Sequence, residues 1–220
     1  MRGLNGKDDI CGKANRVTFM GYIAVQSSMA ESPTTFRVED YRSYLAVLAR
    51  VHLAKAGIVR RKLDASDLVQ DVLLQAHTAQ SQFRGTSPGE YAAWLRRILT
   101  NALVDAQRRH GRQKRDAALE VSCHAAIEES ASNMNALPAR DQTTPSGYAA
   151  RRERALKLAA ALNELPEDQR TAVELRYIGE CSLEEIGAFM NRTTPSVAGL
   201  LRRGLQDLRE GLARSGLTPG

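Results

Sequence analysis

The sequence predicts an all-α protein of two small helical domains joined by a flexible linker, the C-terminal domain carrying a helix-turn-helix. Apolar residues recur every three or four positions in several separate stretches, which is the spacing of one face of a helix. Residues 117–150 are rich in Ser, Asn, Thr and Pro and poor in large apolar side chains, as linkers are. Residues 181–209 carry start signals for two short helices in succession.

The chain begins with an extension, residues 1–35, whose Gly, Ser, Asn and charged residues follow no period, so we expect it to be poorly ordered. The first domain, residues 36–116, opens with a helix predicted over residues 41–56. Its apolar side chains form one stripe, which is typical of a core helix. His52 and Lys55 flank the stripe, and we expect a single histidine in that position to be structural.

A second helix is predicted over residues 63–77, with Asp64 as its N-cap. Its outer side is acidic, because Asp64, Asp67 and Asp71 share one face and Gln70 lies beside them. The sequence places no His or Glu from another element to complete a metal site there. The face is therefore either a solvated helix surface or a docking surface for a basic partner.

A loop over residues 78–89 leads into a third helix, predicted over residues 90–109. One face of this helix is apolar, and the other carries Arg97, Asn101, Asp105 and Arg108. Seven Lys or Arg residues between positions 96 and 115 stand against a single acidic residue, which predicts contact with a polyanion. The aromatic residues at the start of the helix, Tyr91 and Trp94, suit either the core or stacking on unpaired bases.

The second domain, residues 151–215, begins with two helices predicted over residues 151–165 and 167–178, which a Leu-Pro dipeptide separates. The helix-turn-helix follows. Ser182 and Glu185 have the spacing of a capping box, which marks the start of its first helix.

The second helix of the motif is expected to start at Thr193 or Thr194, whose hydroxyl would cap it, and Pro195 suits the first helical position. Val197 and three leucines at helical spacing, Leu201, Leu205 and Leu208, should pack inward. The outward residues are small, polar or basic: Ser196, Gly199, Arg202, Arg203 and Gln206. Such a face fits the major groove of DNA. The alternative is an ordinary helical hairpin with a solvated basic side.

The composition limits the classes of protein to which the chain can belong. The chain has 220 residues, 43% hydrophobic and 25% charged, with a net charge of +6, which is a soluble globular balance. Three cysteines without a Cys-x-x-Cys pair support neither a disulfide framework nor a zinc site and favour the cytoplasm. No apolar run is long enough to span a bilayer, so no membrane insertion is expected. Phosphate-binding loops and hydrolase motifs are missing from the sequence, so we expect a protein that is not an enzyme and needs no cofactor or metal.

The chain resembles the extracytoplasmic-function (ECF) sigma factors, which are promoter-specificity subunits of bacterial RNA polymerase in the sigma-70 family. Three motifs in the family's order carry the resemblance: DLVQDVLLQAH at residues 67–77, FRGTSPGEYAAWLRRILTNALVD at residues 83–105, and LPEDQRTAVELRYIGECSLEEIG at residues 165–187. The resemblance extends over residues 36–209 apart from the linker. It implies promoter recognition and strand opening for transcription initiation.

The resemblance also assigns roles to particular residues. Asp67, Gln70 and Asp71 match the helix by which the family docks on the largest subunit of core RNA polymerase. The residues that match the minus-ten contacts lie in the loop and on the helix after it: Phe83, Arg84, Gly85, Trp94, Arg97, Asn101 and Arg108. The residues expected at the duplex minus-thirty-five element begin the recognition helix and line its outer face: Arg192, Thr193, Thr194, Ser196, Arg202 and Arg203. Where many members have basic residues early in that helix, this chain has Ala198 and Leu200.

The expected partners are core RNA polymerase and promoter DNA, both duplex and single-stranded, with an anti-sigma protein as a further candidate. The alternative function is a helix-turn-helix regulator that binds duplex DNA without polymerase, and the second domain alone fits it equally well. The acidic face and the aromatic residues beside the basic helix favour the sigma factor, because such a regulator needs neither. A nuclease would need a metal-binding carboxylate cluster, for which only the acidic face is available.

Overall fold

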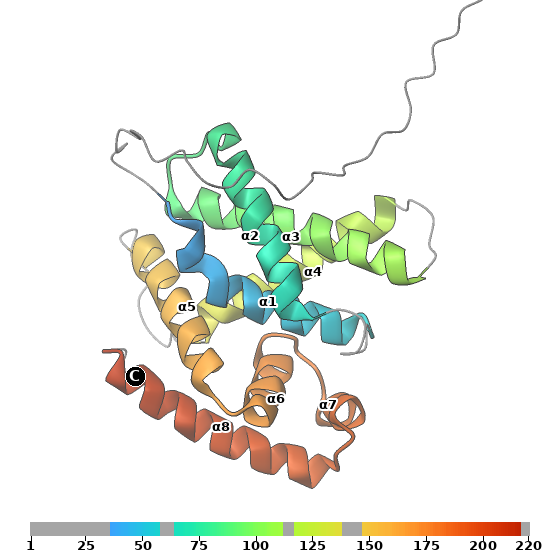
Figure 1. The fold of residues 1–220 in the computed structure, drawn as a ribbon. Helices are drawn as coiled ribbons and strands as arrows, with labels where there is room; N and C mark the ends of the chain where they lie inside the picture. The colour runs from blue at the N-terminus through green and yellow to red at the C-terminus, as the bar shows by residue number, and fades with distance from the viewer. Residues whose placement is uncertain (1–35, 58–63, 112–116, 138–146, 217–220) are drawn as a thin grey trace, which may run out of the picture. The chain divides into compact units, whose positions relative to one another are not determined.

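The computed structural model describes residues 36–57, 64–111, 117–137 and 147–216. These residues form eight α-helices and two short 3₁₀ helices, and none of them lies in a strand (Figure 1). The all-α prediction is confirmed. The predicted poorly ordered extension, residues 1–35, and the basic residues Arg112, Lys114 and Arg115 lie outside the described residues. Among the helices that the structure describes, none has both the length and the apolar composition needed to cross a membrane.

The first region of the fold runs from η1 (Val38–Tyr41) and α1 (Arg42–Lys55) through α2 (Ala65–Ala79) and η2 (Gln80–Gln82) to α3 (Pro88–Gly111). Asp64 caps α2 as predicted, because its carboxylate accepts the N–H of Ser66 at 3.0 Å. The three α-helices begin and end close to the predicted positions, since caps and apolar stripes mark them in the sequence.

Part of the predicted flexible linker, residues 117–150, is instead helical. α4 (Ala117–Ala136) packs along α3, and its inward side chains recur at helical spacing: Cys123, Ile127, Ser130, Ala131 and Met134. Most of these side chains are small, so the segment lacks the large apolar residues that mark a core helix in a sequence. The linker prediction is therefore wrong for residues 117–136, and residues 138–146 lie outside the described part of the chain.

The second region comprises α5 (Gly147–Glu164), α6 (Glu167–Tyr177), α7 (Leu183–Met190) and α8 (Thr194–Arg214). α7 and α8 are the predicted helix-turn-helix, and the capping box of α7 is confirmed. The Ser182 hydroxyl accepts the N–H of Glu185 at 3.2 Å, and the Glu185 carboxylate accepts the N–H of Ser182 at 2.7 Å.

The start of α8 differs from the expectation in one respect. Thr193 is the N-cap, but its side chain makes no capping hydrogen bond, so the predicted hydroxyl cap is wrong. Pro195 lies in the first turn, where its fixed φ favours a helix and its missing N–H leaves nothing unsatisfied. The predicted inward residues Val197, Leu201 and Leu208 are buried, whereas Leu205 is half-buried.

α1 is the central helix. It packs against α2, α3, α4, α5 and α6, and Leu45, Leu48 and Val51 are completely buried. His52 is also buried, and burial, helped by the charge of Lys55, lowers its pKa to about 4. His52 is therefore a neutral core residue at physiological pH, and the described residues from position 36 onward belong to one compact unit.

The turn between α7 and α8 depends on Gly187. A Cβ added there would lie 2.7 Å from the carbonyl oxygen of Arg192, closer than real Cβ contacts allow, so the turn would have to move. Asn191 closes α7 in the left-handed conformation, with φ of 54°. The helix-turn-helix thus needs a residue without a side chain at position 187.

We expect Gly187→Ala to lower the free energy of unfolding by about 1–3 kcal/mol, the usual effect of overpacking, in urea denaturation. Gly199→Ala on α8 is the matched control, because its Cβ would meet only the Arg203 guanidinium, at 3.6 Å. Alanine has a higher helix propensity than glycine, so Gly199→Ala should leave the free energy of unfolding unchanged or raise it by up to about 1 kcal/mol. A Gly187→Ala protein as stable as the unchanged protein would contradict this account of the turn.

Candidate functional site

The outer face of α2 is acidic and contains one exposed leucine. The side chains of Asp67, Gln70 and Asp71 are all exposed, while Leu68 and Val72 on the opposite face are buried. Leu74 lies one turn further along the same face and is 66% exposed. We call these four residues, Asp67, Gln70, Asp71 and Leu74, the acidic face.

Leu74 was not among the residues predicted for docking. It lies three residues after Asp71 and seven after Asp67, which is the spacing of one helix face and could have indicated its position. An apolar side chain surrounded by charged and polar ones has the composition of a protein–protein interface, with an apolar centre and a polar rim.

Phe83 belongs to an aromatic cluster that fixes the loop before α3. Its ring packs edge-on against Tyr91 at 5.1 Å and against Phe36 at 6.0 Å, and it lies 5.4 Å from the Trp94 ring. Tyr91 is fully buried, and burial raises its pKa to about 12. Tyr91 is therefore a core residue, whereas Phe83 and Trp94 are half-buried and keep part of their rings accessible.

Two further features hold this loop in place. A Cβ on Gly85 would lie 2.4 Å from the Phe83 ring, so only glycine fits there without moving the ring. Glu90 accepts the backbone N–H groups of Thr86 and Ser87, both at 2.9 Å, and these hydrogen bonds lower the pKa of its carboxyl. Ser87 in turn accepts the N–H of Glu90 at 3.2 Å. This capping box was not predicted, although its Ser-x-x-Glu spacing is visible in the sequence.

The arginines of α3 divide into two groups. Arg96 is engaged by α4, because its guanidinium donates to both carboxylate oxygens of Glu128 at 2.7 Å and to the Tyr44 hydroxyl at 3.2 Å. Arg108, predicted as a DNA contact, is 23% exposed and lies 3.5 Å from Asp105 and 3.9 Å from Glu120 of α4.

Arg97, Asn101 and Arg109 are exposed on the remaining side of α3, spaced about one turn or more apart. Arg109 was not among the predicted contacts, although its spacing from Asn101 and Asp105 could have placed it there. Arg84 in the preceding loop is exposed as well. We use the name α3 surface for six accessible residues of this helix and loop: Phe83, Arg84, Trp94, Arg97, Asn101 and Arg109. Asp105 is also exposed on α3 and pairs with Arg108.

The recognition helix α8 presents the predicted outward face, which we call the α8 surface: Ser196, Arg202 and Arg203. The two arginines are exposed and Ser196 is half-buried. Ala198 is exposed, but Leu200 is buried at 7% exposure and packs inward.

The residues at the start of α8 lie in different environments. Thr193 is exposed and Thr194 is half-buried. The guanidinium of Arg192 forms an ion pair with Asp168 at the start of α6. This ion pair fixes the turn of the motif against α6 and occupies part of the donor capacity of Arg192.

The site is thus made of three surfaces and not of one pocket. The acidic face carries carboxylates without cationic partners in the part of the chain that the structure describes. The α3 and α8 surfaces carry exposed arginines. Within the described ranges, no three His, Cys, Asp or Glu side chains gather as they would to hold a metal ion. The arrangement is suited to binding partners of opposite charge.

Two family descriptions match the chain, in the order of its two regions. Residues 38–113 match Sigma-70 region 2, and residues 155–208 match Sigma-70, region 4. The first match contains the acidic face and the α3 surface, and the second contains the α8 surface. A helix-turn-helix regulator that binds duplex DNA without polymerase would need only the second region. That alternative therefore does not explain why the first region matches Sigma-70 region 2.

Similar proteins carry ECF sigma factor names. The ECF RNA polymerase sigma factor SigE of Mycolicibacterium smegmatis is 34% identical over 151 residues, which cover 69% of this chain and 52% of that protein. SigW of Bacillus subtilis is 26% identical over 187 residues, covering 85% of this chain and 90% of that one. The sigma-E factor of Escherichia coli K12 is 28% identical over 156 residues, covering 69% and 77%.

A solved structure is also similar in sequence. The sigma factor RpoE of Bartonella quintana, crystallised with the anti-sigma factor NepR, is 22% identical, covering 80% of this chain and 98% of that one, with a TM-score of 0.29. The family descriptions cover both helical regions in the right order, and the relatives agree with them. The chain therefore belongs to the ECF group of the sigma-70 family.

Proposed function

We propose that this sigma factor docks on core RNA polymerase through the acidic face, holds the opened minus-ten strand on the α3 surface and reads the duplex minus-thirty-five element with the α8 surface. The observation that carries the proposal is the presence in one chain of exposed carboxylates on α2 and exposed arginines on α3 and α8. A carboxylate face repels DNA and attracts a basic protein, so a protein that bound only DNA would not need it.

The acidic face has the parts that a docking surface needs. Asp67 and Asp71 would speed encounter with a basic surface and fix its register, an effect that salt screens. Leu74 would supply contact area that excludes water, which salt does not weaken in the same way. The contributions of charge and of apolar contact to the binding affinity at this face can therefore be separated by their different dependence on salt.

The α3 surface suits a single strand better than a duplex. The accessible parts of Phe83 and Trp94 offer stacking for unpaired bases, which contributes about 1–3 kcal/mol per base. Arg97 and Asn101 lie within two turns of Trp94, where they can hold the phosphates and bases of the same strand. Opening a promoter without ATP requires such capture of unstacked bases, because each extruded base costs a few kcal/mol.

The α8 surface suits duplex DNA. Ala198 and the half-buried Gly199 let the start of the helix approach the groove, and Arg202 and Arg203 can anchor phosphates. Leu200 is buried and cannot contact a base. We infer that readout of the minus-thirty-five element depends more on DNA shape than on a dense set of base contacts.

The docking role predicts two kinds of loss at the acidic face. Asp67→Arg combined with Asp71→Arg should abolish co-purification with core polymerase, because it presents positive charge to a basic partner. Leu74→Ala should weaken binding by roughly tenfold, since a buried leucine contributes about 1.5–3 kcal/mol and alanine retains part of that. Rising salt should weaken the unchanged and Leu74→Ala proteins in parallel, because the substitution removes no charge.

The control for Leu74→Ala is Val121→Ala, which removes another exposed apolar side chain, 71% exposed on α4, away from this face. It should bind core polymerase normally. Undiminished binding by a folded Asp67/Asp71 double variant would refute the docking assignment.

The strand-capture role predicts a defect that pre-melted DNA relieves. A duplex promoter is first selected from random-sequence DNA with holoenzyme that contains the unchanged protein. Arg97→Ala and Asn101→Ala should each impair run-off transcription by holoenzyme from this promoter. A template with an unpaired bubble over the minus-ten element should restore most of the activity, because the cost of unpairing is already met. Permanganate reactivity of thymines would report opening directly.

Arg214→Ala, at the exposed end of α8, is the control and should initiate normally on both templates. Equal defects of the α3 variants on both templates, with normal thymine reactivity on duplex, would show that α3 is not the melting element. Failure of the unchanged protein to stimulate promoter-dependent initiation by core polymerase would refute the proposed function as a whole.

A further inference from the structure

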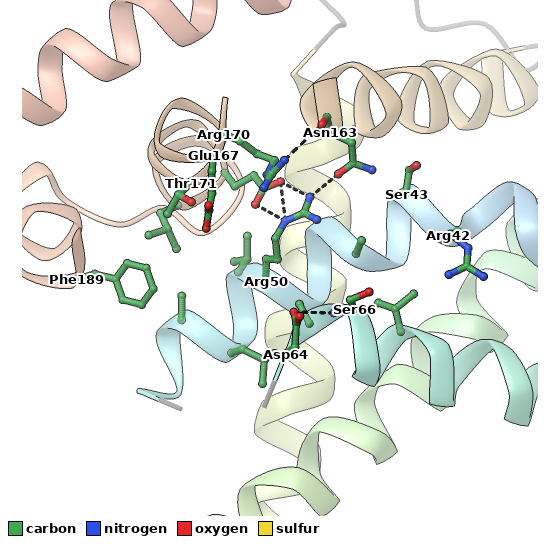
Figure 2. Close-up of a pocket in the computed structure, with 18 residues that line it drawn as sticks. Arg42, Ser43, Arg50, Asp64, Ser66, Asn163, Glu167, Arg170, Thr171 and Phe189 are labelled. Carbon is green, nitrogen blue, oxygen red and sulfur yellow. Dashed lines mark hydrogen bonds and ion pairs between the residues drawn. The ribbon is translucent and has the colours of Figure 1, made fainter. Parts of the chain in front are cut away.

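Among the described residues, most carboxylates that bind an arginine join one helix to another. In Figure 2, dashed lines run from the Arg50 guanidinium of α1 to neighbouring side chains. One of these is Glu174 of α6, which is 2% exposed and accepts from Arg50 Nε at 2.9 and 3.2 Å. Asp105 of α3 is different, because it is 66% exposed and pairs at 3.5 Å with Arg108 of its own helix. Helix packing therefore does not explain its position.

Asp105 lies among the residues of the α3 surface. It shares one face of the helix with side chains three or four positions apart: Trp94, Arg97 and Asn101. No other acidic residue occurs between Trp94 and Gly111. A carboxylate among cations repels the phosphates that those cations attract, and an exposed pair within one helix adds little to stability. Asp105 therefore lowers the affinity of α3 for DNA in general.

Two guanidinium groups flank the Asp105 carboxylate. Nη1 of Arg108 lies 3.5 Å from Oδ1, and Nε of Arg109 donates to the backbone carbonyl oxygen of Asp105 at 3.3 Å. Oδ2 accepts no hydrogen bond from the part of the chain that the structure describes. The arginines thus hold positive charge on either side of a carboxylate that keeps one oxygen for a further donor.

A carboxylate accepts hydrogen bonds and donates none, so it needs a donor on the nucleic acid. Phosphates offer none. Cytosine N4 is the amino group that Asp and Glu read on base edges, whereas guanine and thymine present only acceptors in the major groove. Adenine carries an amino group beside the acceptor N7, which repels a carboxylate. Cytosine presents N4 in the major groove even when it is paired, so this contact does not require strand opening.

Asp105 contacts a different base from those that Phe83 and Trp94 can stack on. It lies eleven residues after Trp94, which is about 16 Å along the helix axis. This length corresponds to about five base pairs of duplex DNA. The base at Asp105 therefore belongs to the end of the minus-ten region away from the loop that holds Phe83.

We propose that Asp105 is a specificity-determining residue, which reads a cytosine at that end of the minus-ten region and weakens binding to promoters that lack it. The inference rests on the proposed function, because it requires α3 to bind promoter DNA. The arginines of this helix bind the phosphates of any sequence, and the carboxylate selects among sequences.

Base substitution in the selected promoter tests the proposal. Each base pair of the minus-ten region is replaced by the three others, and binding by holoenzyme is measured. The unchanged protein should require cytosine at one position outside the stacked bases, with at least about fivefold weaker binding for any other base there.

Two substitutions of Asp105 should change this preference in different ways. Asp105→Ala should bind all four bases at that position within about twofold, and should bind the promoters without the cytosine more tightly than the unchanged protein does. Asp105→Asn should move the preference at the same position to adenine, because an amide donates to N7 while it accepts from N6.

Glu153→Ala is the matched control. Glu153 is 67% exposed and pairs at 2.8 Å with Lys157 of its own helix, and α5 contributes to none of the three surfaces. This variant should keep every base preference of the unchanged protein.

Three results would overturn the proposal: no cytosine requirement in the unchanged protein, an unaltered requirement in Asp105→Ala, or an equal loss of affinity for every sequence in Asp105→Ala. The last would show that Asp105 serves only to hold Arg108. Failure of the unchanged holoenzyme to select any promoter would instead refute the proposed function, and this inference with it.

Discussion

The packing of α6 on α1, among the helices that the structure describes, depends on a charged side chain held at a buried contact. Arg50 extends from a helix that is covered by five others, and Glu174 neutralises it from α6. Burial raises the pKa of the Glu174 carboxyl, and the Arg50 guanidinium counteracts that rise. Removing either partner would leave the other charge poorly solvated, which typically costs about 3–5 kcal/mol. The ion pair therefore fixes the register of α6 on α1 more than it adds to net stability, and α7 and α8 are positioned through α6.

A second electrostatic feature sets how much positive charge is available to DNA. The sequence concentrates Lys and Arg between positions 96 and 115, but Glu128 and Glu120 of α4 engage Arg96 and Arg108. The exposed arginines of α3 are thus fewer than the sequence indicates. Every cationic surface binds duplex DNA non-specifically, and a surface with fewer free arginines attracts phosphates less and shows less of this binding. Aromatic stacking then contributes a larger share of the affinity for a single strand.

The sequence predicted the elements whose signals are local. Ser182 and Asp64 cap their helices as expected, because a cap depends on residues only two or three positions away. Residues 117–136 have the composition of a linker, with few large apolar residues, and the structure buries mostly small side chains there, which give little hydrophobic signal even at helical spacing. The pairing of Arg50 with Glu174 was not predicted, since it joins residues 124 positions apart and nothing local distinguishes it from a surface charge. The separate surfaces were predictable, and their arrangement around α1 was not.

Arg50 and Glu174 join α1 and α6 energetically as well as by contact. A double-mutant cycle tests this coupling most directly: urea unfolding of the unchanged protein, Arg50→Ala, Glu174→Ala and the double variant. If the pair holds α6 on α1, the two substitutions should be non-additive, with a coupling energy of about 3 kcal/mol or more, close to the loss from either single substitution, so that the double variant should be scarcely less stable than either single one. A coupling energy of zero within error would show that α1 and α6 are held together by other contacts and would contradict this account.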